Sequence, residues 1–496
     1  MLNWFTSLWP STRRAASPQL RRDARVDHGR AYDAGGTTRV NQKAWQNAGT
    51  AEIDRDLLPT LETMRNRGRN ERQNSGYAAG IVRTYQDDLV GDAGPKLQIE
   101  SDDDTWNDWA EAAWAAWCEY CEPSGRQHFV DLLWMEVGQL WYDGEFLSQE
   151  VSEIDGQTVA YRNLPLAPDR LATPPAFLLD KDVRGGVRFT KNLKPTEYYI
   201  LKTHPGSYNV FASAWQYDTI PAKDIIHCFP VLGAGQSRGE PWLSPVLPLF
   251  AQLRQYGMDT ILAARAAAMM GAAIFKTTHP SLQVESGADL EILDIEPGSG
   301  MMLPEGWDAQ QLKAEFPTTS HEQFVKTNLS EIGRPGNMPY LKTAASAAGH
   351  NYSSARIDLQ GYWAGLARIQ GWIGRVRCNR ALRAVLREHG LVDRMRAPAE
   401  WKATWIWPKP PHIDPQKEAV AQETRLRSGV TSLAIECKRE NLDWEDVLKQ
   451  QAKEMKLRRE LGLPQPTFGA TAPAKTANAT AADDGSEPTE DGSANE

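Results

Sequence analysis

The sequence has no segment suited to anchoring the chain in a membrane or to exporting it. Its longest apolar helical pattern, at residues 244–275, contains Arg254, Asp259 and Arg265 as well as prolines. A membrane-spanning helix needs about 20 predominantly apolar residues, so this pattern does not qualify. The N-terminal aromatic residues precede Arg13 and Arg14, whereas a signal peptide begins with its positive charges. We therefore expect neither a membrane span nor a signal peptide.

An excess of basic residues is also missing. The chain has 55 Lys and Arg against 64 Asp and Glu, a formal net charge of −9. Tight binding of nucleic acid needs clustered cations that displace counterions, so this balance argues against a protein that grips DNA. It does not argue against a protein that DNA merely passes, because a neutral or acidic wall repels phosphate.

Cysteines are few, and the patterns of metal and cofactor sites are absent. The five cysteines are widely spaced (Cys118, Cys121, Cys228, Cys378 and Cys437), which does not indicate a disulfide framework and fits a reducing cytoplasm. Cys118 and Cys121 have zinc-like spacing but no second ligand pair, so we interpret them as packed thiols. His227 lies in an apolar strand pattern and is interpreted as a core residue. No Walker A sequence is present, and we expect neither a metal nor a cofactor.

One short motif offers an enzymatic alternative. Gly235-Gln-Ser237-Arg-Gly239 matches the nucleophile elbow of serine hydrolases and follows a predicted strand. The elbow requires a helix directly after the serine, and Pro241 and Pro245 oppose one. A hydrolase built on Ser237 therefore remains only a minor alternative, and we identify no catalytic residues.

Hydrophobic periodicity predicts a mainly α protein with β-rich insertions, an α+β fold. At 496 residues we expect two to four structural regions. The 18 Trp indicate either large contact surfaces or a Trp-rich core, and both interpretations stay open. Apolar spacing predicts helices over 56–91, interrupted by a basic junction at Arg65–Arg72, and over 105–121 and 127–143. Short strand patterns then occupy 145–230.

The second half is dominated by long helical patterns. Residues 244–275 predict a helix about 45 Å long, 319–333 a short helix, 334–352 a loop rich in Gly, Pro and Ala, and 353–389 the longest amphipathic helix. One face of that helix is basic (Arg368, Arg375, Arg380, Arg383 and Arg387). Its glycines at 361, 365, 371 and 374 cost about 1 kcal/mol each relative to Ala, which close packing on another helix would explain. A Trp/Pro-rich link at 401–411, helices at 414–428 and 443–461, and a disordered tail follow.

Several separated motifs, in the same order along residues 30 to 463, resemble the lambda-type family of bacteriophage portal proteins. They are Tyr32-Asp33-Ala34, Arg65–Arg72, Leu89-Val90-Gly91, Ile220–His227, Gln236–Pro241, Glu296-Pro297-Gly298, Leu303–Gly306, Asn351–Arg356, Asp414–Ala419 and Leu461-Gly462-Leu463. The segment Arg334–Gly349 departs from the family's usual sequence before the Tyr-Ser-Ser motif and is instead rich in Ala and Gly.

The resemblance implies the portal architecture of wing, stem, clip, spine helix and crown, assembled as a ring. It predicts an N-terminal arm (1–60), a wing (61–243), a stem helix (244–275), a clip (276–317), a second stem helix (318–333), a channel loop (334–352), a spine helix (353–390), a crown (391–463) and a disordered acidic tail (464–496). Gln236, Arg238 and Gly239 would form the turn into the stem. Tyr352, Ser353, Ser354 and Arg356 would start the spine helix, with Ser353 or Ser354 as its N-cap.

The resemblance also implies a function without catalysis. The chain would form a homo-oligomeric ring, typically dodecameric, at one capsid vertex, assembled in the host bacterial cytoplasm and retained in the virion. Double-stranded DNA would pass through it during packaging and ejection. Arg334, Asn337, Lys342 and His350 are the candidate DNA-contacting residues of the loop. The expected partners are the terminase large subunit, the major capsid and scaffolding proteins, and head-completion or adaptor proteins. A head protein without a channel is the remaining alternative.

Overall fold

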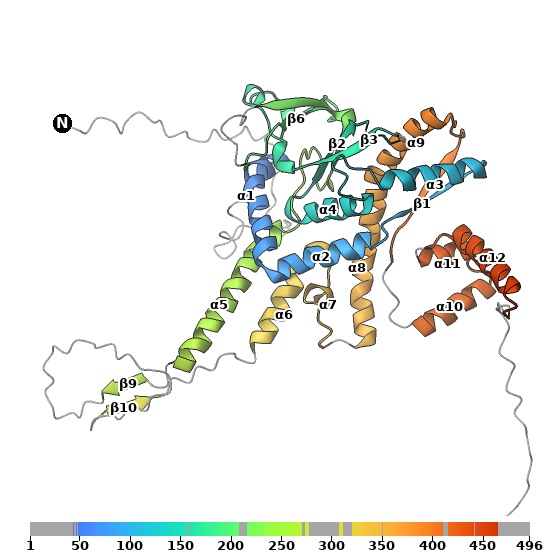
Figure 1. The fold of residues 1–496 in the computed structure, drawn as a ribbon. Helices are drawn as coiled ribbons and strands as arrows, with labels where there is room; N and C mark the ends of the chain where they lie inside the picture. Colours follow the sequence, from blue (N-terminus) through green and yellow to red (C-terminus); the bar gives the residue numbers. More distant parts are fainter. Residues whose placement is uncertain are drawn as a thin grey trace, which may run out of the picture. The chain divides into compact units, whose positions relative to one another are not determined.

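The computed structural model describes residues 43, 46, 48–154, 156–157, 159–207, 216–269, 273–276, 307–310, 320–349, 351–409, 415–440 and 442–464. Residues Met1–Glu52 and Ile53–Glu496 are separate units, and every described helix and strand belongs to the second (Figure 1). Most of the predicted N-terminal arm and clip, and the tail from 465 onward, lie outside the described residues. No described helix combines the length and apolar character required to cross a membrane.

Four helices open the described fold: α1 (Ile53–Asn74), α2 (Gly76–Val90), α3 (Asp104–Cys118) and α4 (Phe129–Tyr142). The prediction of a junction between two helices at Arg65–Arg72 is wrong, because α1 runs through this segment. The helical structure is interrupted only at Ser75, which is the N-cap of α2. Arg65 lies on the buried face of α1 together with Leu57, Leu61 and Gly68. Arg65 therefore belongs to the interior of the fold, whereas Arg67 and Arg72 are exposed, and α1 also begins earlier than the predicted arm boundary.

The predicted β-rich region forms two antiparallel sheets. One has the order β3-β2-β8, with β2 Phe146–Ser152, β3 Tyr161–Leu166 and β8 Ile225–Cys228. The other has the order β4-β5-β6-β7, with β4 Val183–Arg184, β5 Val187–Phe189, β6 Pro195–Leu201 and β7 Tyr217–Pro221. Both sheets lie within 145–230, where short strand patterns were predicted.

A further strand pair joins residues about 300 positions apart. β1 (Lys96–Ser101) pairs antiparallel with β11 (Trp401–Ile406), with Leu97 opposite Trp405 and Ile99 opposite Ala403. The prediction of an irregular link at 401–411 is therefore wrong over its first six residues. Trp401-Lys-Ala-Thr-Trp-Ile forms a strand because β1 supplies the partner for its backbone groups.

Helical rods follow the sheets. A 3₁₀ turn (Ser244–Val246) leads into α5 (Leu247–Met269), and the hairpin of β9 (Ala273–Lys276) and β10 (Trp307–Gln310) comes next. The predicted helix over 244–275 is thus too long at its C-terminal end, because Ala273–Lys276 pairs with Trp307–Gln310. With 23 residues, α5 is about 35 Å long. The short helix predicted at 319–333 is α6 (Ser320–Ile332).

The longest predicted helix is confirmed and extends further. α8 (Tyr352–Ile373), a π-helical turn (Gly374–Cys378) and α9 (Asn379–Asp393) follow one another without a break, and we call them the rod (Figure 1). The expectation that its glycines pack on another helix is wrong within this chain. A Cβ at Gly361 would meet nothing within 4 Å, Gly365 faces Asn337, and Gly374 faces Trp405 of β11.

The last described part contains α10 (Pro415–Arg427), α11 (Leu433–Arg439) and α12 (Trp444–Glu460). Helix α11 was not predicted, whereas the predicted acidic start of α12 is present, with Asp443 as the N-cap. Part of the tryptophan content lies in the core: Trp106, Trp117 and Trp141 are fully buried, and Trp114 packs edge-on against Phe129 and Trp405. Whether the half-buried tryptophans also form contact surfaces stays a prediction.

Candidate functional site

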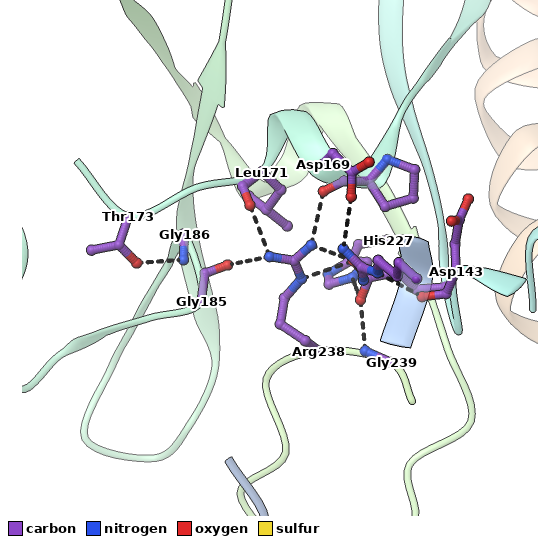
Figure 2. Close-up of polar contacts among 12 residues, drawn as sticks. Asp143, Asp169, Leu171, Thr173, Gly185, Gly186, His227, Arg238 and Gly239 are labelled. Atoms are coloured by element: carbon purple, nitrogen blue, oxygen red, sulfur yellow. Dashed lines mark hydrogen bonds and ion pairs between the residues drawn. The ribbon is translucent and has the colours of Figure 1, made fainter. Parts of the chain in front are cut away.

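The turn that leads into α5 is held by a buried arginine. Arg238 is 4% exposed, and its guanidinium donates hydrogen bonds to the backbone carbonyls of Pro168, Leu171 and Gly185, each at 2.8 Å. Figure 2 shows the carbonyl groups of Leu171 and Gly185 hydrogen-bonded to the guanidinium of Arg238. Pro168 and Leu171 precede β4, the first strand of the second sheet, and Gly185 follows it. Arg238 was predicted as part of the turn, and the structure shows that it fixes this turn to the β-rich region.

Glu145 is the anion at the centre of this cluster. It is completely buried and forms ion pairs with Arg238 (2.6 Å) and with Arg65 of α1 (2.8 Å). His227 Nε2 lies 3.1 Å from Oε2 of Glu145, and the backbone N–H of Gly239 donates to the same oxygen at 2.6 Å. Burial alone would raise the pKa of Glu145, but the charges of Arg238 and Arg65 hold it well below its usual value.

Two glycines allow the chain segments around Glu145 to touch. A Cβ on Gly239 would lie 2.1 Å from the carbonyl oxygen of Gly144, and Gly144 itself has a φ of +83°. On the α1 side, Arg69 forms ion pairs with Asp143 and Asp169. The cluster thus joins α1, β2, β8 and the turn before α5. The side chains of Glu145, Arg65, Arg238 and His227 are at most 5% exposed, so this centre is structural, and the interpretation of His227 as a satisfied core residue is confirmed.

The structure gives no support to a serine nucleophile. Ser237 is 2% exposed, its backbone N–H donates to Asp54 at 2.9 Å, and no described residue hydrogen-bonds its hydroxyl. Helical structure begins only at Ser244, which confirms that no helix directly follows the serine. Gln236 instead uses its side chain inside the turn, donating to the carbonyl of Arg238 and accepting from Leu232 N–H.

The described residues also offer no metal site: they contain no group of three or more His, Cys, Asp or Glu side chains arranged to hold one. All five cysteines are free and buried. Burial raises the pKa of Cys121 to about 12, so its thiol stays protonated. The interpretation of Cys118 and Cys121 as packed thiols is confirmed.

Helices α5 and α6 contact one another near the middle of α5. The ring of Tyr256 stacks on His321 and packs against Phe324 of α6, with ring centroids 5.3 and 4.6 Å apart. Arg254 ties α5 to Glu71 of α1 at 3.0 Å. Beyond this point α5 exposes three large apolar side chains at i, i+3 and i+4, which lie on one face of a helix. They are Met258, Ile261 and Leu262, each more than half exposed.

The first part of the predicted channel loop is folded and packed. A 3₁₀ turn (Arg334–Gly336) places Gly336 against the ring of Trp141, and α7 (Tyr340–Thr343) follows. Lys342 Nζ lies 2.9 Å from the carboxylate of Asp88 on α2, which also accepts a hydrogen bond from the hydroxyl of Tyr362. One carboxylate therefore fastens both this segment and α8. The prediction of a loop over 334–352 is wrong for Tyr340–Thr343, which form α7.

The remaining loop candidates are differently placed. Arg334 and Asn337 are exposed, and Asn337 has a left-handed backbone with a φ of 52°. His350 lies outside the described residues. The continuously exposed stretch is Ala347–Gly349. Whether any of these residues contacts DNA stays a prediction.

The start of the rod differs from the predicted cap. Asn351 is the N-cap: its side chain accepts a hydrogen bond from Ser354 N–H, and the Ser354 hydroxyl accepts one from Asn351 N–H. The predicted caps were Ser353 and Ser354, but both lie inside the helix, which begins at Tyr352. Arg356 is exposed in its first turns. The reciprocal bonding is a capping box, in which Asn replaces the usual Ser or Thr.

Charged residues missed by the sequence interpretation anchor the rod. Arg377 pairs with Glu136 of α4 at 2.8 Å with both side chains buried, and Arg380 pairs with Glu150 of β2 at 2.7 Å. Glu388 accepts the backbone N–H groups of Ala160 and Tyr161. The available signal was the single charge of Glu136 inside the apolar run Leu132–Val137, since a buried charge requires a partner.

The family model and the curated relatives agree on one family. The family model described as "Phage portal protein, lambda family" matches residues 39–370. The chain is 24% identical over 456 residues to the "Probable portal protein" of Halomonas phage phiHAP-1, covering 86% of this chain and 87% of that protein. It is 23% identical to the portal protein of Escherichia phage N15 (89% and 93% covered) and 21% identical to portal protein B of Escherichia phage lambda (89% and 92% covered). Among solved structures it matches a chain from the neck of an empty gene transfer agent particle with a TM-score of 0.44 and 12% identity, covering 82% and 94%.

Proposed function

This chain belongs to the lambda family of phage portal proteins, and from that premise we propose that its copies close into a ring through which double-stranded DNA passes. The observation that carries the proposal is the exposed apolar face of α5. Met258, Ile261 and Leu262 are 57%, 51% and 55% exposed in the single chain. A face of this kind indicates an interaction surface, and a neighbouring copy would cover it.

A closed ring also requires a second, different surface for the neighbour to contact. Cyclic assembly with more than two subunits joins unlike faces of adjacent copies. Phe324 of α6 and Ile357 of α8 are 44% and 67% exposed, and these helices are candidates for that second face. In line with the family, we propose twelve copies at one vertex of the capsid.

The channel would contact DNA without reading its sequence. Arg334, Asn337 and the exposed stretch Ala347–Gly349 would lie nearest to the DNA backbone, with Lys342 and His350 as further candidates, because contacts to phosphate carry no sequence information. The formal net charge of −9 favours passage over retention. The contact between Lys342 and Asp88 would hold the base of this segment still while its exposed end moves.

The partners follow from the same premise. The segment containing the β9–β10 hairpin would dock the terminase large subunit during packaging and later head-completion or adaptor proteins. The outer surfaces would contact the major capsid and scaffolding proteins. Assembly would take place in the host cytoplasm, and the ring would remain in the virion as the path for genome ejection.

Electron microscopy of the purified full chain tests the ring. We expect closed rings with a central opening and predominantly twelvefold symmetry. A monomer that forms no rings at any concentration would overturn the proposal, and a closed assembly without an opening would favour a head protein without a channel. The Ser237→Ala variant should form the same rings, because that serine is buried in the turn.

A further inference from the structure

The C-terminal end of the rod borders a basic hollow that has no role in the proposed channel. Its volume is about 620 Å³, within the range of sites that hold small ligands or short peptide segments. Its floor is aromatic and apolar, with Trp106, Trp109, Trp401 and Met395. Four arginines surround this floor: Arg383, Arg387, Arg394 and Arg396.

These arginines differ from their neighbours on the same rod. Arg377 and Arg380 pair with Glu136 and Glu150. The four arginines of the hollow are all exposed, and none has an ion-pair partner within the part of the chain that the structure describes. The carboxylate of Asp393, the residue before Arg394, accepts a hydrogen bond from Trp109 Nε1 at 3.0 Å and lies 3.8 Å from Nδ1 of His389. The guanidinium groups of the hollow therefore carry positive charge that forms no ion pair with Asp393.

One wall of the hollow is formed by the end of α9 and the segment that folds back against it. Helix α9 ends at Arg394, which has a left-handed backbone with a φ of 56°. The chain then folds back so closely that a Cβ on Gly390 would lie 2.9 Å from the carbonyl oxygen of Met395. This return brings Arg394 and Arg396 to the hollow that Arg383 and Arg387 of α9 also line.

We propose that this hollow binds the acidic C-terminal tail of the chain itself. Residues 465–496 contain one lysine and six acidic residues (Asp483, Asp484, Glu487, Glu490, Asp491 and Glu496). Charge complementarity is therefore strong, with carboxylates matching guanidinium groups that bind them bidentately. The apolar floor suits the small Ala, Gly and Pro residues between the acids. This inference does not depend on ring formation.

The tail can reach the hollow from its attachment point. Lys449 of α12 lies 3.4 Å from Asp108 of α3, and Asp108 precedes Trp109 of the floor. From Lys449 to the end of α12 at Glu460 is about 17 Å. A linker as long as the stretch from Pro464 to Asp483 can span about 26 Å. Attachment in the same molecule also gives the tail an effective concentration in the millimolar range.

Duplex DNA fits the hollow less well than the tail does. A duplex presents a convex and rigid backbone, whereas the arginines surround a concave site with an apolar floor. An extended peptide can enter such a site and place side chains on the tryptophans. Occupation by the tail would also keep four arginines from binding DNA non-specifically, which a conduit must avoid.

The test compares two full-length proteins, the wild type and a variant whose six tail acids are changed to Asn or Gln. The probe is a labelled peptide of residues 481–496, measured by fluorescence anisotropy at low salt. We expect the neutral-tail protein to bind the probe at least tenfold more tightly than the wild type, whose own tail competes. Adding Arg383→Gln and Arg387→Gln to the neutral-tail protein should weaken binding at least tenfold.

Arg368→Gln, on the same rod but outside the hollow, is the matched control and should leave binding unchanged. Circular dichroism and the assembly state must agree among all variants compared. Equal probe binding by the wild-type and neutral-tail proteins would overturn the proposal, as would unchanged binding after the two hollow substitutions. Displacement of the probe by a 20-base-pair duplex at lower concentration than by unlabelled peptide would assign the hollow to DNA instead.

Discussion

Arg377 Nε lies 2.8 Å from Oε2 of Glu136, and neither side chain is more than 1% exposed. The pair joins the π-helical turn of the rod to α4, and the Ser148 hydroxyl completes the carboxylate at 2.9 Å. Removing one partner of a buried pair leaves an uncompensated charge, which costs about 3–5 kcal/mol. We expect Glu136→Gln to lower the free energy of unfolding by this amount, measured by chemical denaturation. The double variant Glu136→Leu with Arg377→Met should lose less than the sum of the single changes, and strict additivity would contradict a direct interaction.

Gly239 is predicted to tolerate no side chain. A Cβ at this position would lie 2.1 Å from the backbone carbonyl oxygen of Gly144. Gly144 precedes Glu145 in the chain, and the N–H of Gly239 donates a hydrogen bond to Glu145. Overpacking of this kind costs about 3 kcal/mol, so Gly239→Ala should unfold at clearly lower denaturant concentration. Gly361→Ala is the matched control, since a Cβ there meets nothing within 4 Å and Ala favours the helix by about 0.5–1 kcal/mol. Similar stability of the two variants would refute the close approach.

The exposed face of α5 gives a direct test of the ring. Ile261→Glu places a charge beside Met258 and Leu262, on the face that a neighbouring copy is proposed to cover. Burial of each large apolar side chain there would stabilise the interface by about 1.5–3 kcal/mol. We expect the fraction of protein in rings to fall at least tenfold, measured by mass photometry. Ile154→Glu is the control, because Ile154 is 91% exposed and lies just after β2 rather than on α5. Equal ring formation by both variants would rule out the α5 face as an interface.

Sequence patterns identified α5 and the rod because helical periodicity is a local property. The stripe from Leu359 to Val385 predicted the rod, and the turn before α5 was placed at Gln236–Gly239. The interactions that fix these elements were not predictable, because they are non-local. Glu145 lies 80 residues from Arg65 and 93 from Arg238 along the chain, and an arginine in an isolated segment is usually solvated.

The same reasoning explains the missed strand at Trp401–Ile406 and the packed loop. Trp401–Ile406 becomes a strand through pairing with Lys96–Ser101, which no local signal specifies. The Gly-, Pro- and Ala-rich composition of 334–352 indicated a loop. The composition does not reveal that Gly336 allows contact with Trp141, or that Asp88 binds Lys342.

The attachment of α7 to α2 can be tested by proteolysis. Asp88 holds Lys342 at 2.9 Å and accepts the Tyr362 hydroxyl. In Asp88→Asn the ion pair is lost, so α7 should open more often and trypsin should cleave after Lys342 several times faster. Tyr362→Phe keeps the ion pair and should be cleaved at a rate closer to the wild type. Unchanged cleavage in Asp88→Asn would show that the ion pair does not hold this segment.

The contact between α3 and α12 should depend on pH through Glu111. Burial raises the pKa of Glu111 to about 7, and the nearby charges of Asp443, Glu445 and Asp108 add to this, while the Ile99 N–H that it accepts at 2.6 Å opposes the shift. Because the folded pKa lies above the unfolded value of about 4.5, the protonated form favours the folded state. Its contribution is fully present below pH 4.5 and is lost as the pH rises to 7.

Above pH 7 the charged Glu111 therefore repels the acidic start of α12, whereas the exposed contact between Lys449 and Asp108 attracts α12 to α3. We expect hydrogen exchange of the α12 amides, corrected for intrinsic rates, to be faster at pH 8 than at pH 6. Glu111→Gln removes the titrating group and should reduce this difference, whereas Glu62→Gln, exposed on α1, should not. If the difference between pH 6 and pH 8 is the same in Glu111→Gln and in the wild type, Glu111 does not control the pH dependence of this contact.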